Sequence, residues 1–200
     1  MPMSIRSCAR LVSSPWLAVL LAACSSSSTP SAGAGGDSGG ASASQTPPTS
    51  GPAVETWLQG GAYKSWHCEA ASHPARSPSP HGINRICSND LASSFSGTGE
   101  RPEGTAAVKE LYDDAGMNVV GYAVYSKTQA TSAGGSNWYW YERVPTSSAV
   151  PHDAQGVVAD GLGASGTPMT ICVACHAAAG SDAPHTPSPG GGDEVYTQVH

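Results

Sequence analysis

The chain has 200 residues, including 24 glycines and 16 prolines, so it can form one packed domain with less structured segments attached. Its formal net charge is −6, and its nine Lys and Arg residues form no basic cluster. This balance argues against nucleic acid as a partner and against binding to anionic lipid through surface charge.

The first 23 residues, 1–23, have the features of a secretory signal peptide. Two arginines precede the apolar run LVSSPWLAVLLAAC, which is too short and too interrupted by Ser and Pro to span a bilayer. The run ends in LAAC, which resembles a bacterial lipobox, so we expect cleavage before Cys24 and a lipid on its thiol. An ordinary signal peptide followed by an unrelated cysteine is the alternative. Because Ser25 is not aspartate, the anchor is expected in the outer membrane, facing the periplasm.

Residues 24–52 are predicted to be a disordered tether that begins at the lipidated cysteine. They are almost wholly Ser, Gly, Ala, Thr and Pro, with too little apolar surface to offset the entropy of folding. Cleavage of the leader would also remove Arg6 and Arg10, which shifts the net charge from −6 to −8. The remaining segment, residues 53–200, has the length of a single domain.

The pattern of this domain predicts an α+β fold, an antiparallel β-sheet with a few peripheral helices. Residues 54–68, VETWLQGGAYKSWHC, are expected to be helical, although two adjacent glycines weaken the pattern. A Pro-rich loop follows, then a strand at INRIC and a short helix in residues 88–95 with an Asn or Ser cap. Short turns join three alternating segments that predict antiparallel strands: residues 105–113, 118–127 and 137–144.

The alternation within these strands assigns side chains to the two faces of the sheet. In the last strand one face carries Trp138, Trp140 and Glu142, and the other carries Tyr139, Tyr141 and Arg143. In residues 105–113, Lys109 shares a face with Ala107 and Leu111, so a single amine lies among apolar neighbours. An edge-strand lysine that points to solvent is the ordinary explanation of that pattern.

Two of the six cysteines have no assigned role once the others are placed by context. The four placed cysteines are Cys8 in the leader, Cys24 at the predicted lipid site, and Cys172 and Cys175 in one short motif. The remaining pair, Cys68 and Cys87, is predicted to form a disulfide, because the protein is exported. Closing a loop of about 20 residues would stabilise the fold by roughly 3 kcal/mol in the chain-entropy model. Two separate buried thiols are the alternative.

The motif CVACH, residues 172–176, is the attachment signature of c-type haem. On one helical turn both thiols and the imidazole of His176 project from the same face. The thiols could then bond to the vinyl groups of a haem while the imidazole ligates its iron, with the other ring nitrogen donating to a backbone carbonyl or similar partner. We therefore expect one covalent haem c per chain, held by Cys172 and Cys175, with His176 on the iron.

Two other uses of the motif fit the sequence less well. A zinc site would need a further paired set of ligands, and the chain has no second Cys-x-x-Cys motif. A thioredoxin-like dithiol would follow a strand, whereas residues 161–170 before the motif have the composition of a Gly-rich loop. Export also favours haem, since covalent attachment takes place outside the cytoplasm.

Five segments in this order resemble the cytochrome P-460 family, which includes the cytochromes c′-beta: SPHGINRICSNDLA, GERPEGTAAVKELYD, GYAVYSK, NWYWYERV and CVACH. They cover most of residues 57–176, and only CVACH is specific by itself. The resemblance implies an antiparallel sheet, often in a dimer, and a c-type haem with histidine on one side of the iron and an open position on the other. One departure is the aromatic content: a distal Phe cap is common in the family, and this chain has only Phe95.

The resemblance implies one of two functions. Members of the P-460 type carry a lysine linked to a haem meso carbon and oxidise hydroxylamine, whereas members of the c′-beta type lack the link and bind nitric oxide. Lys109 falls in the matching VKE strand, and Lys127 is its competitor. Burial beside a haem would favour the neutral amine that such a link requires. Arg85 and Glu142 are candidate acid-base groups by strand position, with surface salt bridges as the ordinary alternative.

Two further functions stay open. An electron-transfer cytochrome would recruit a Met or His as the sixth iron ligand, with His81 favoured among five candidates. The candidates are Met117, Met169, His73, His81 and His152. The other function is a tethered domain that scavenges or senses nitric oxide without turnover. The expected partners are a small nitrogen-oxide substrate or ligand, a redox partner protein, the membrane through Cys24 and, by the resemblance, a second copy of the chain.

Overall fold

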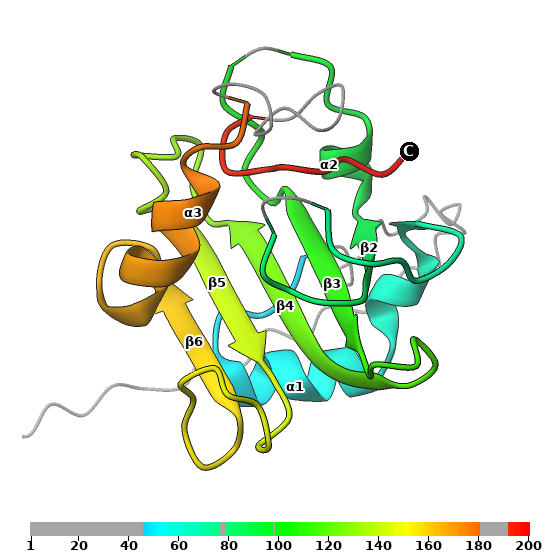
Figure 1. Cartoon of the computed structure of the whole chain (residues 1–200). Helices are drawn as coiled ribbons and strands as arrows, with labels where there is room; N and C mark the ends of the chain where they lie inside the picture. Colours follow the sequence, from blue (N-terminus) through cyan, green and yellow to red (C-terminus); the bar gives the residue numbers. More distant parts are fainter. Residues whose placement is uncertain (1–45, 77–78, 98, 181–191) are drawn as a thin grey trace, which may run out of the picture. The chain divides into compact units, whose positions relative to one another are not determined.

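A six-stranded antiparallel sheet organises the computed structural model, which describes residues 46–76, 79–97, 99–180 and 192–200 (Figure 1). The strand order in space follows the order in sequence, and every neighbouring pair is antiparallel. The strands are β1 His67–Cys68, β2 Asn84–Ser88, β3 Ala106–Tyr112, β4 Val119–Lys127, β5 Trp138–Arg143 and β6 Val157–Leu162. The predicted α+β class is therefore confirmed. The predicted signal peptide and Cys24 lie outside the described residues.

Within the described residues, five short helical segments accompany the sheet. They are α1 Gly51–Gln59, the 3-10 helix η1 Ala62–Ser65, α2 Asp90–Ser93, the π-helix η2 Pro168–Val173 and α3 Ala174–His176. Among the described residues, no helix is both long and apolar enough to cross a membrane. The strands predicted within residues 105–113, 118–127 and 137–144 are confirmed as β3, β4 and β5, with ends shifted by one residue. The strands β1 and β6 were not predicted from the sequence.

The predicted helix over residues 54–68 is corrected in length. The helix α1 begins at Gly51, whose backbone N–H donates to Asp160 Oδ2 at 2.9 Å, and it ends at the two glycines that follow. Gly61 has a φ of 69°, in the left-handed region that favours glycine, so the chain turns there instead of continuing the helix. Cys68 consequently lies in a strand rather than in the helix.

The predicted disulfide between Cys68 and Cys87 is present. The two residues are direct partners across β1 and β2, so the bond joins neighbouring strands instead of a helix and a strand. The predicted Asn cap is also confirmed, because the side chain of Asn89 accepts from Ala92 N at 3.0 Å at the start of α2. The same oxygen accepts from Ala106 N at 3.1 Å, which ties α2 to the beginning of β3.

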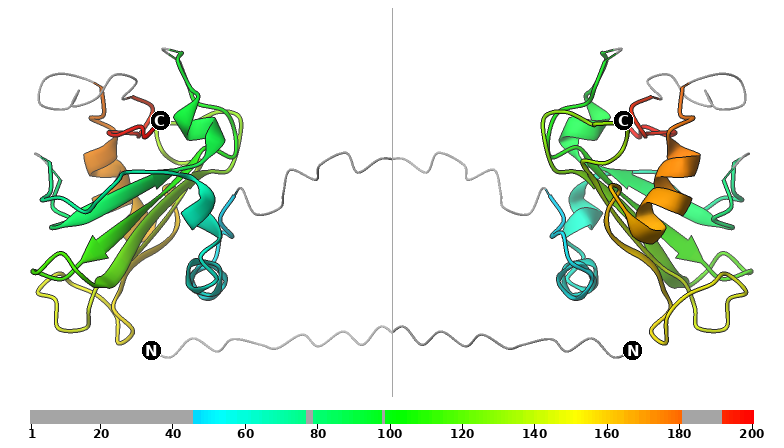
Figure 2. Two further views of the ribbon diagram at one scale, coloured as in Figure 1. Left: turned by 90° about the vertical axis from the view of Figure 1, so that its right-hand side faces the viewer. Right: turned by 90° about the vertical axis from the view of Figure 1, so that its left-hand side faces the viewer.

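Helical segments cover both faces of the sheet, as the side views in Figure 2 show. On one face, α1 packs Val54 and Leu58 against Val108 and Val124 of the sheet. On the opposite face, Val173 at the end of η2 packs against two tryptophans of β5. We call these the α1 face and the cavity face. The predicted alternation of β5 is confirmed, since Tyr139 and Tyr141 belong to the cluster on the α1 face and Trp138 and Trp140 to the other.

Candidate functional site

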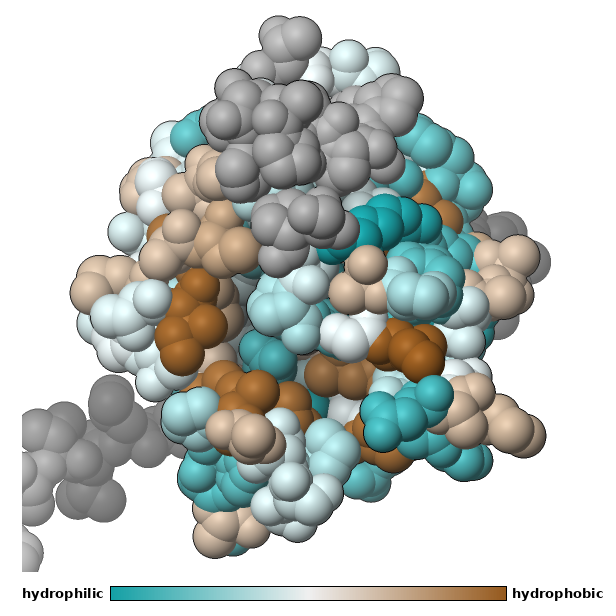
Figure 3. Space-filling model, in the orientation of Figure 1, coloured by the Kyte–Doolittle hydropathy of each residue, from teal (hydrophilic) through white to brown (hydrophobic). Residues whose placement is uncertain are grey.

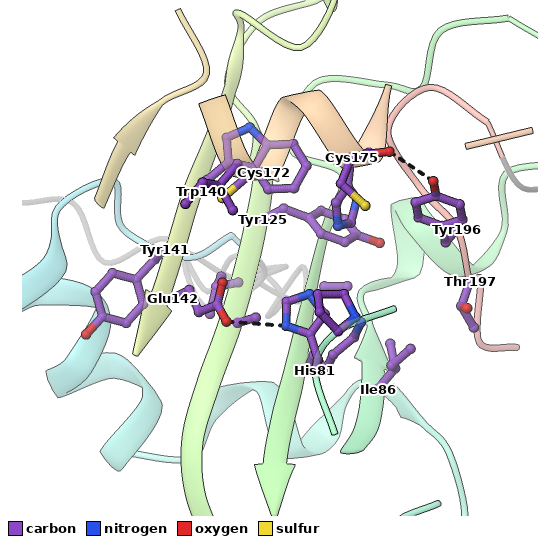
Figure 4. A pocket seen from close by; sticks show the side chains of 17 residues that line it. His81, Ile86, Tyr125, Trp140, Tyr141, Glu142, Cys172, Cys175, Tyr196 and Thr197 are labelled. Carbon is purple, nitrogen blue, oxygen red and sulfur yellow. Dashed lines mark hydrogen bonds and ion pairs between the residues drawn. The ribbon is translucent and has the colours of Figure 1, made fainter. Parts of the chain in front are cut away.

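A cavity lies between the sheet and the helical segment that carries the CVACH motif (Figure 4). Its volume is about 110 Å³, well above the roughly 10–15 Å³ that a single water needs. Its walls are mainly apolar and aromatic. The lining residues are Pro80, His81, Ile86, Ala107, Lys109, Ala123, Val124, Tyr125, Trp140, Tyr141, Glu142, Ile171, Cys172, Cys175, His176, Tyr196 and Thr197.

The floor of the cavity consists of two rows of side chains that run across neighbouring strands. The strand register fixes both rows, because residues paired across an antiparallel sheet point to the same face. One row is Ile86, Lys109, Ala123 and Glu142, and the other is Ala107, Tyr125 and Trp140. The alanines leave free space above the middle strands, while larger side chains stand around them.

The CVACH segment reaches the sheet because the preceding loop comes very close to β5. At Gly163 a side chain would meet the carbonyl oxygen of Gly135 at 2.2 Å and a Val173 methyl group at 2.6 Å, so only glycine fits. Pro168 begins the π-helix η2, and α3 follows it directly. The expected single α-helical turn is therefore corrected to a π-helical turn that passes into an α-helical one.

Both cysteines and the histidine of the motif line this one cavity. Cys172 and Cys175 are free thiols, and burial raises the pKa of Cys172 to about 12, so its sulfur is protonated at neutral pH. The backbone carbonyl of Cys175 accepts from the hydroxyl of Tyr196 at 2.9 Å. Ile171, next to the motif, is 47% exposed and also lines the cavity, so an apolar side chain borders its opening.

His176 is held in one orientation by its surroundings. Its Nδ1 lies 2.6 Å from the backbone carbonyl of Glu194, and a carbonyl only accepts, so Nδ1 carries the proton. Three aromatic rings surround the imidazole, with centroid distances of 4.7 Å to Trp140, 5.4 Å to Tyr196 and 6.1 Å to Tyr125. Burial lowers the pKa of His176 to about 3, so the ring is neutral and Nε2 is left with a lone pair.

Lys109 lies on the cavity face in the interior of the sheet. Its strand β3 pairs with β2 and β4, and Lys109 itself is paired with Ile86 and Ala123. The explanation by an edge-strand lysine is therefore wrong for this residue. The side chain lines the cavity, and burial lowers its pKa to about 8 against an ordinary 10.5. A neutral amine is thus accessible near physiological pH.

Lys127, the competing lysine, is buried away from the cavity. It is only 1% exposed, and its Nζ donates to the carbonyl of Arg101 at 2.7 Å and to Asp193 Oδ2 at 3.1 Å. Lys127 is the last residue of β4, and nothing in the local sequence indicates its buried ion pair with Asp193. Its amine is engaged in a structural network.

Glu142 and His81 meet at one side of the cavity, joined by the dashed line in Figure 4. Glu142 Oε1 lies 3.3 Å from His81 Nδ1, and each side chain is 13% exposed. Burial, followed by the nearby Lys109 amine, lowers the pKa of His81. Glu142 reaches the cavity through its register position in β5, whereas His81 enters from the Pro-rich loop.

Arg85, the other acid-base candidate, does not belong to the cavity. It pairs with Glu110 across β2 and β3, and its guanidinium contacts Glu110 Oε2 at 3.4 Å and the Glu69 carbonyl at 2.7 Å. Glu110 also accepts from Tyr63, which belongs to the cluster on the α1 face. The alternation that puts Ile86 into the cavity therefore puts Arg85 on the other face.

The remaining candidate iron ligands do not line the cavity either. Met117 is 78% exposed in the turn between β3 and β4, and Met169 is 44% exposed in η2. His73 contacts Glu69 at 2.9 Å, and His152 contacts the carbonyl of Asp153 at 2.6 Å. Of the five proposed sixth ligands, only His81 has a side chain at this site.

Three aromatic or hydroxyl side chains that line the cavity were not predicted: Tyr125, Tyr196 and Thr197. The alternation of residues 118–127 could have indicated Tyr125, because it shares a face with Ala123. No local pattern marks the other two, which lie in the irregular C-terminal segment. That segment closes one side of the cavity (Figure 4).

A polar branch continues from the cavity beneath the Pro-rich loop. Besides residues of the main cavity, Arg76, Ser79 and Asn84 line this branch, and Lys109 borders both spaces. Arg76 also pairs with Glu69 at 2.7 Å. Cations and amide groups at one end of an apolar cavity are suited to a ligand that is mainly hydrophobic but ends in carboxylates.

The donor set of the site fits a covalently bound haem. Within the described residues, no group of three or more His, Cys, Asp or Glu side chains could hold a metal ion by itself. A haem iron needs only one such ligand, and a neutral imidazole with Nδ1 engaged leaves Nε2 for it. The two free thiols of the motif line the same space. Figure 3 shows hydrophobic residues (brown) near the middle of this side of the molecule.

Comparisons with known proteins found no match: no family model matches the sequence, and no curated protein is similar to it. The likeness to the cytochrome P-460 family thus rests on the five quoted segments.

Proposed function

We propose that the domain is a mono-haem c-type cytochrome of the P-460 type, with haem bonded to Cys172 and Cys175 and its iron ligated by His176. The observation that supports this most is the convergence of these three side chains on one cavity. The hydrogen bond from His176 Nδ1 to the Glu194 carbonyl also favours the tautomer with Nδ1 protonated, which leaves Nε2 free to ligate an iron.

The walls of the cavity suit a flat macrocycle. The small side chains of Ala107 and Ala123 leave space above the sheet. Trp140 and Tyr125 provide aromatic surface beside His176. The polar branch with Arg76 and Asn84 offers partners for the propionate groups. When bound, the haem would supply an iron with one open coordination position for hydroxylamine or nitric oxide.

Oxidation of hydroxylamine requires groups that accept protons and a partner that accepts electrons. Conversion of one hydroxylamine to nitric oxide releases three protons and three electrons. The electrons would pass to an external redox protein, and the nearest proton acceptors at the cavity are Glu142 and His81. Glu142 acts as the base, and His81 holds its carboxylate in place and can pass a proton onward.

Lys109 is the candidate for the haem cross-link of the P-460 type. Formation of one bond from Nζ to a meso carbon removes an N–H and a C–H hydrogen, as two protons and two electrons, and an external oxidant such as a peroxide would take the electrons. The low pKa of Lys109, about 8, makes the nucleophilic amine available. Without this link, the same site would bind nitric oxide as a scavenger or sensor.

A second candidate function is electron transfer with His81 as sixth ligand. One observation favours it: Nδ1 of His81 faces the Glu142 carboxylate, which is the arrangement of a metal-binding histidine with an acidic partner. Ligation by Nε2 would close the open position and exclude substrate.

The mass of the denatured protein tests the haem assignment. Mature protein made in cells that attach c-type haem should retain the mass of one haem, and the Cys172→Ser/Cys175→Ser variant should not. His176→Ala should keep the thioethers and lose the proximal nitrogen ligand. A mature wild-type chain with no added haem, or with both thiols free to alkylation, would refute the proposal.

The spectrum of the reduced protein separates the functions. A P-460 band indicates the cross-linked enzyme, a five-coordinate high-spin band the nitric-oxide-binding protein, and sharp six-coordinate α and β bands the electron-transfer protein. A haem peptide that contains both CVACH and the Lys109 segment would support the link. Lys109→Ala should abolish hydroxylamine turnover and retain nitric oxide binding, whereas the exposed Lys64→Ala is the matched control.

A further inference from the structure

A tight turn at residues 192–195, in the C-terminal segment drawn red in Figure 1, contacts the motif histidine. Reciprocal backbone hydrogen bonds close it, from Gly192 N to Val195 O at 2.8 Å and from Val195 N to Gly192 O at 3.1 Å. Its central residues, Asp193 and Glu194, have φ values of 49° and 70°. Residues other than glycine rarely adopt this left-handed backbone conformation. It persists only where the surrounding structure enforces it, and it is frequent at functional sites.

The carboxylate of Asp193 anchors the turn to the domain. Its Oδ2 accepts from the backbone N–H of Arg101 at 2.6 Å and from Lys127 Nζ at 3.1 Å, and its Oδ1 accepts from the Ser132 hydroxyl. Lys127 and Ser132 are buried, so this is an interior network. A buried carboxylate with three donors is held far more firmly than a surface ion pair.

The rest of the segment is fastened at a second point. The side chain of Gln198 accepts from Arg101 at 3.1 Å and donates to the carbonyls of Ser93 and Phe95 at 2.7 Å each. Between the two anchors, Val195 is fully buried in the cluster with the β5 tryptophans. The backbone between residues 192 and 198 therefore has little freedom to shift.

The constrained backbone meets the CVACH motif at two atoms. The Glu194 carbonyl accepts from His176 Nδ1 at 2.6 Å, and the Tyr196 hydroxyl donates to the Cys175 carbonyl at 2.9 Å. The direction of the Glu194 carbonyl depends on the left-handed conformation of the turn. The anchors thus act on the imidazole through one backbone oxygen.

We propose that the 192–195 turn is a clamp for His176, with Asp193 as its positioning residue and Lys127 as the buried partner that holds Asp193. The clamp keeps the proton on Nδ1, orients Nε2 toward the cavity and makes the imidazole a stronger electron donor. This inference rests on the proposed haem function for its consequence, but the state of the ring can be measured without haem. Asp193 touches neither the cavity nor the motif, so its effect is indirect.

The first experiment uses ¹⁵N NMR of the histidine rings in the full chain without haem. His176→Gln identifies the His176 signals among those of the seven histidines. Wild-type His176 should show a single tautomer with Nδ1 protonated, and Asp193→Ala should give a mixture of tautomers. The matched control is Asp113→Ala, because Asp113 also closes a turn, by accepting from Met117 N at 2.9 Å, but lies between β3 and β4.

Two further variants separate the clamp from general damage. In Asp193→Ala/Lys127→Met the buried amine that loses its carboxylate partner is also removed, so the chain should fold better than Asp193→Ala and still show mixed tautomers. Glu194→Gly keeps the carbonyl and tolerates the positive φ, so it should retain the wild-type tautomer. A single Nδ1-protonated tautomer in the folded double variant, or mixed tautomers in Glu194→Gly, would overturn the clamp.

A second readout applies to protein with bound haem. Loss of the hydrogen bond should raise the reduction potential and lower the iron–histidine stretching frequency in Asp193→Ala, with both unchanged in Asp113→Ala. Equal potentials in wild type and Asp193→Ala would overturn the inference. If no variant, including wild type, carries haem, the proposed function fails while the NMR experiment still decides on the clamp.

Discussion

The two faces of the sheet, formed by alternate residues of the same strands, differ in how their polar side chains are paired. On the α1 face, three tyrosine hydroxyl groups are matched to carboxylates. Tyr63 donates to Glu110, Tyr139 to Asp160 and Tyr141 to Glu55, each at 2.6 Å. On the cavity face, the side-chain amine of Lys109 makes no hydrogen bond or ion pair within the described residues, and His81 and Glu142 pair with each other beside the cavity.

The two faces therefore differ in how their charged side chains are paired. A buried polar group without a partner costs roughly 1–3 kcal/mol. The carboxylates of the α1 face are already used by tyrosines. Lys109 and the free nitrogen of His176 border the cavity, where a bound ligand would supply the missing interactions.

The largest expected effect is on the α1 face. Leu58 is 1% exposed in the core beneath α1, so Leu58→Ala should lower the free energy of unfolding by about 2–5 kcal/mol. Urea denaturation measures this change. Leu91→Ala is the matched control, because Leu91 is 39% exposed. Haem content per folded chain should stay at the wild-type level, and its loss in Leu58→Ala would show that the two faces are not independent.

The disulfide comes next in expected effect. Both cysteines contact the cluster of the α1 face, and Cys68→Ser/Cys87→Ser should destabilise the fold by roughly 3 kcal/mol. The melting temperature of oxidised and double-variant protein measures the effect. Peptide mapping without reductant should recover the linked Cys68 and Cys87 peptides, and two separately alkylated peptides would contradict the bond.

Much of the sheet could be predicted because three strands alternate clearly and short turns join them. The same alternation predicted the faces of Trp140, Tyr141 and Glu142. The strand β6, VVADGL, was missed because its Asp and Gly are poor strand formers and no alternation marks it. The strand β1 has only two residues, and its pairing depends on contacts distant in sequence.

The candidate site was predictable where its chemistry is encoded locally. The spacing of CVACH is such a local signal, and so is the strand position of Lys109 and Glu142. Arg85 was assigned from strand position without knowledge of its register, and one residue of difference puts it on the other face. The contribution of Glu194 and Tyr196 arises from a C-terminal segment that only the tertiary structure brings to the motif.

A smaller effect is expected for the buried amine of the cavity face. The pKa of Lys109 is about 8 in the fold against an ordinary 10.5, so between these values the unfolded chain binds more protons than the folded one. The free energy of unfolding should therefore rise with pH across this window. Lys109→Met should lack the rise. Urea midpoints of both haem-free proteins between pH 7.5 and 9.5 measure the difference, and parallel curves would contradict the lowered pKa.

The smallest effect is expected for Arg85, and it sharpens the contrast between the faces most directly. Arg85 is partly exposed and shares Glu110 with two tyrosines, so Arg85→Gln should cost less than about 1 kcal/mol of stability. Because its side chain is on the α1 face, nitric oxide affinity and hydroxylamine turnover should match wild type.

Glu142→Gln is the isosteric counterpart on the cavity face and should slow turnover at least tenfold with similar stability. Equal kinetic effects of the two variants would mean that position relative to the cavity does not decide function.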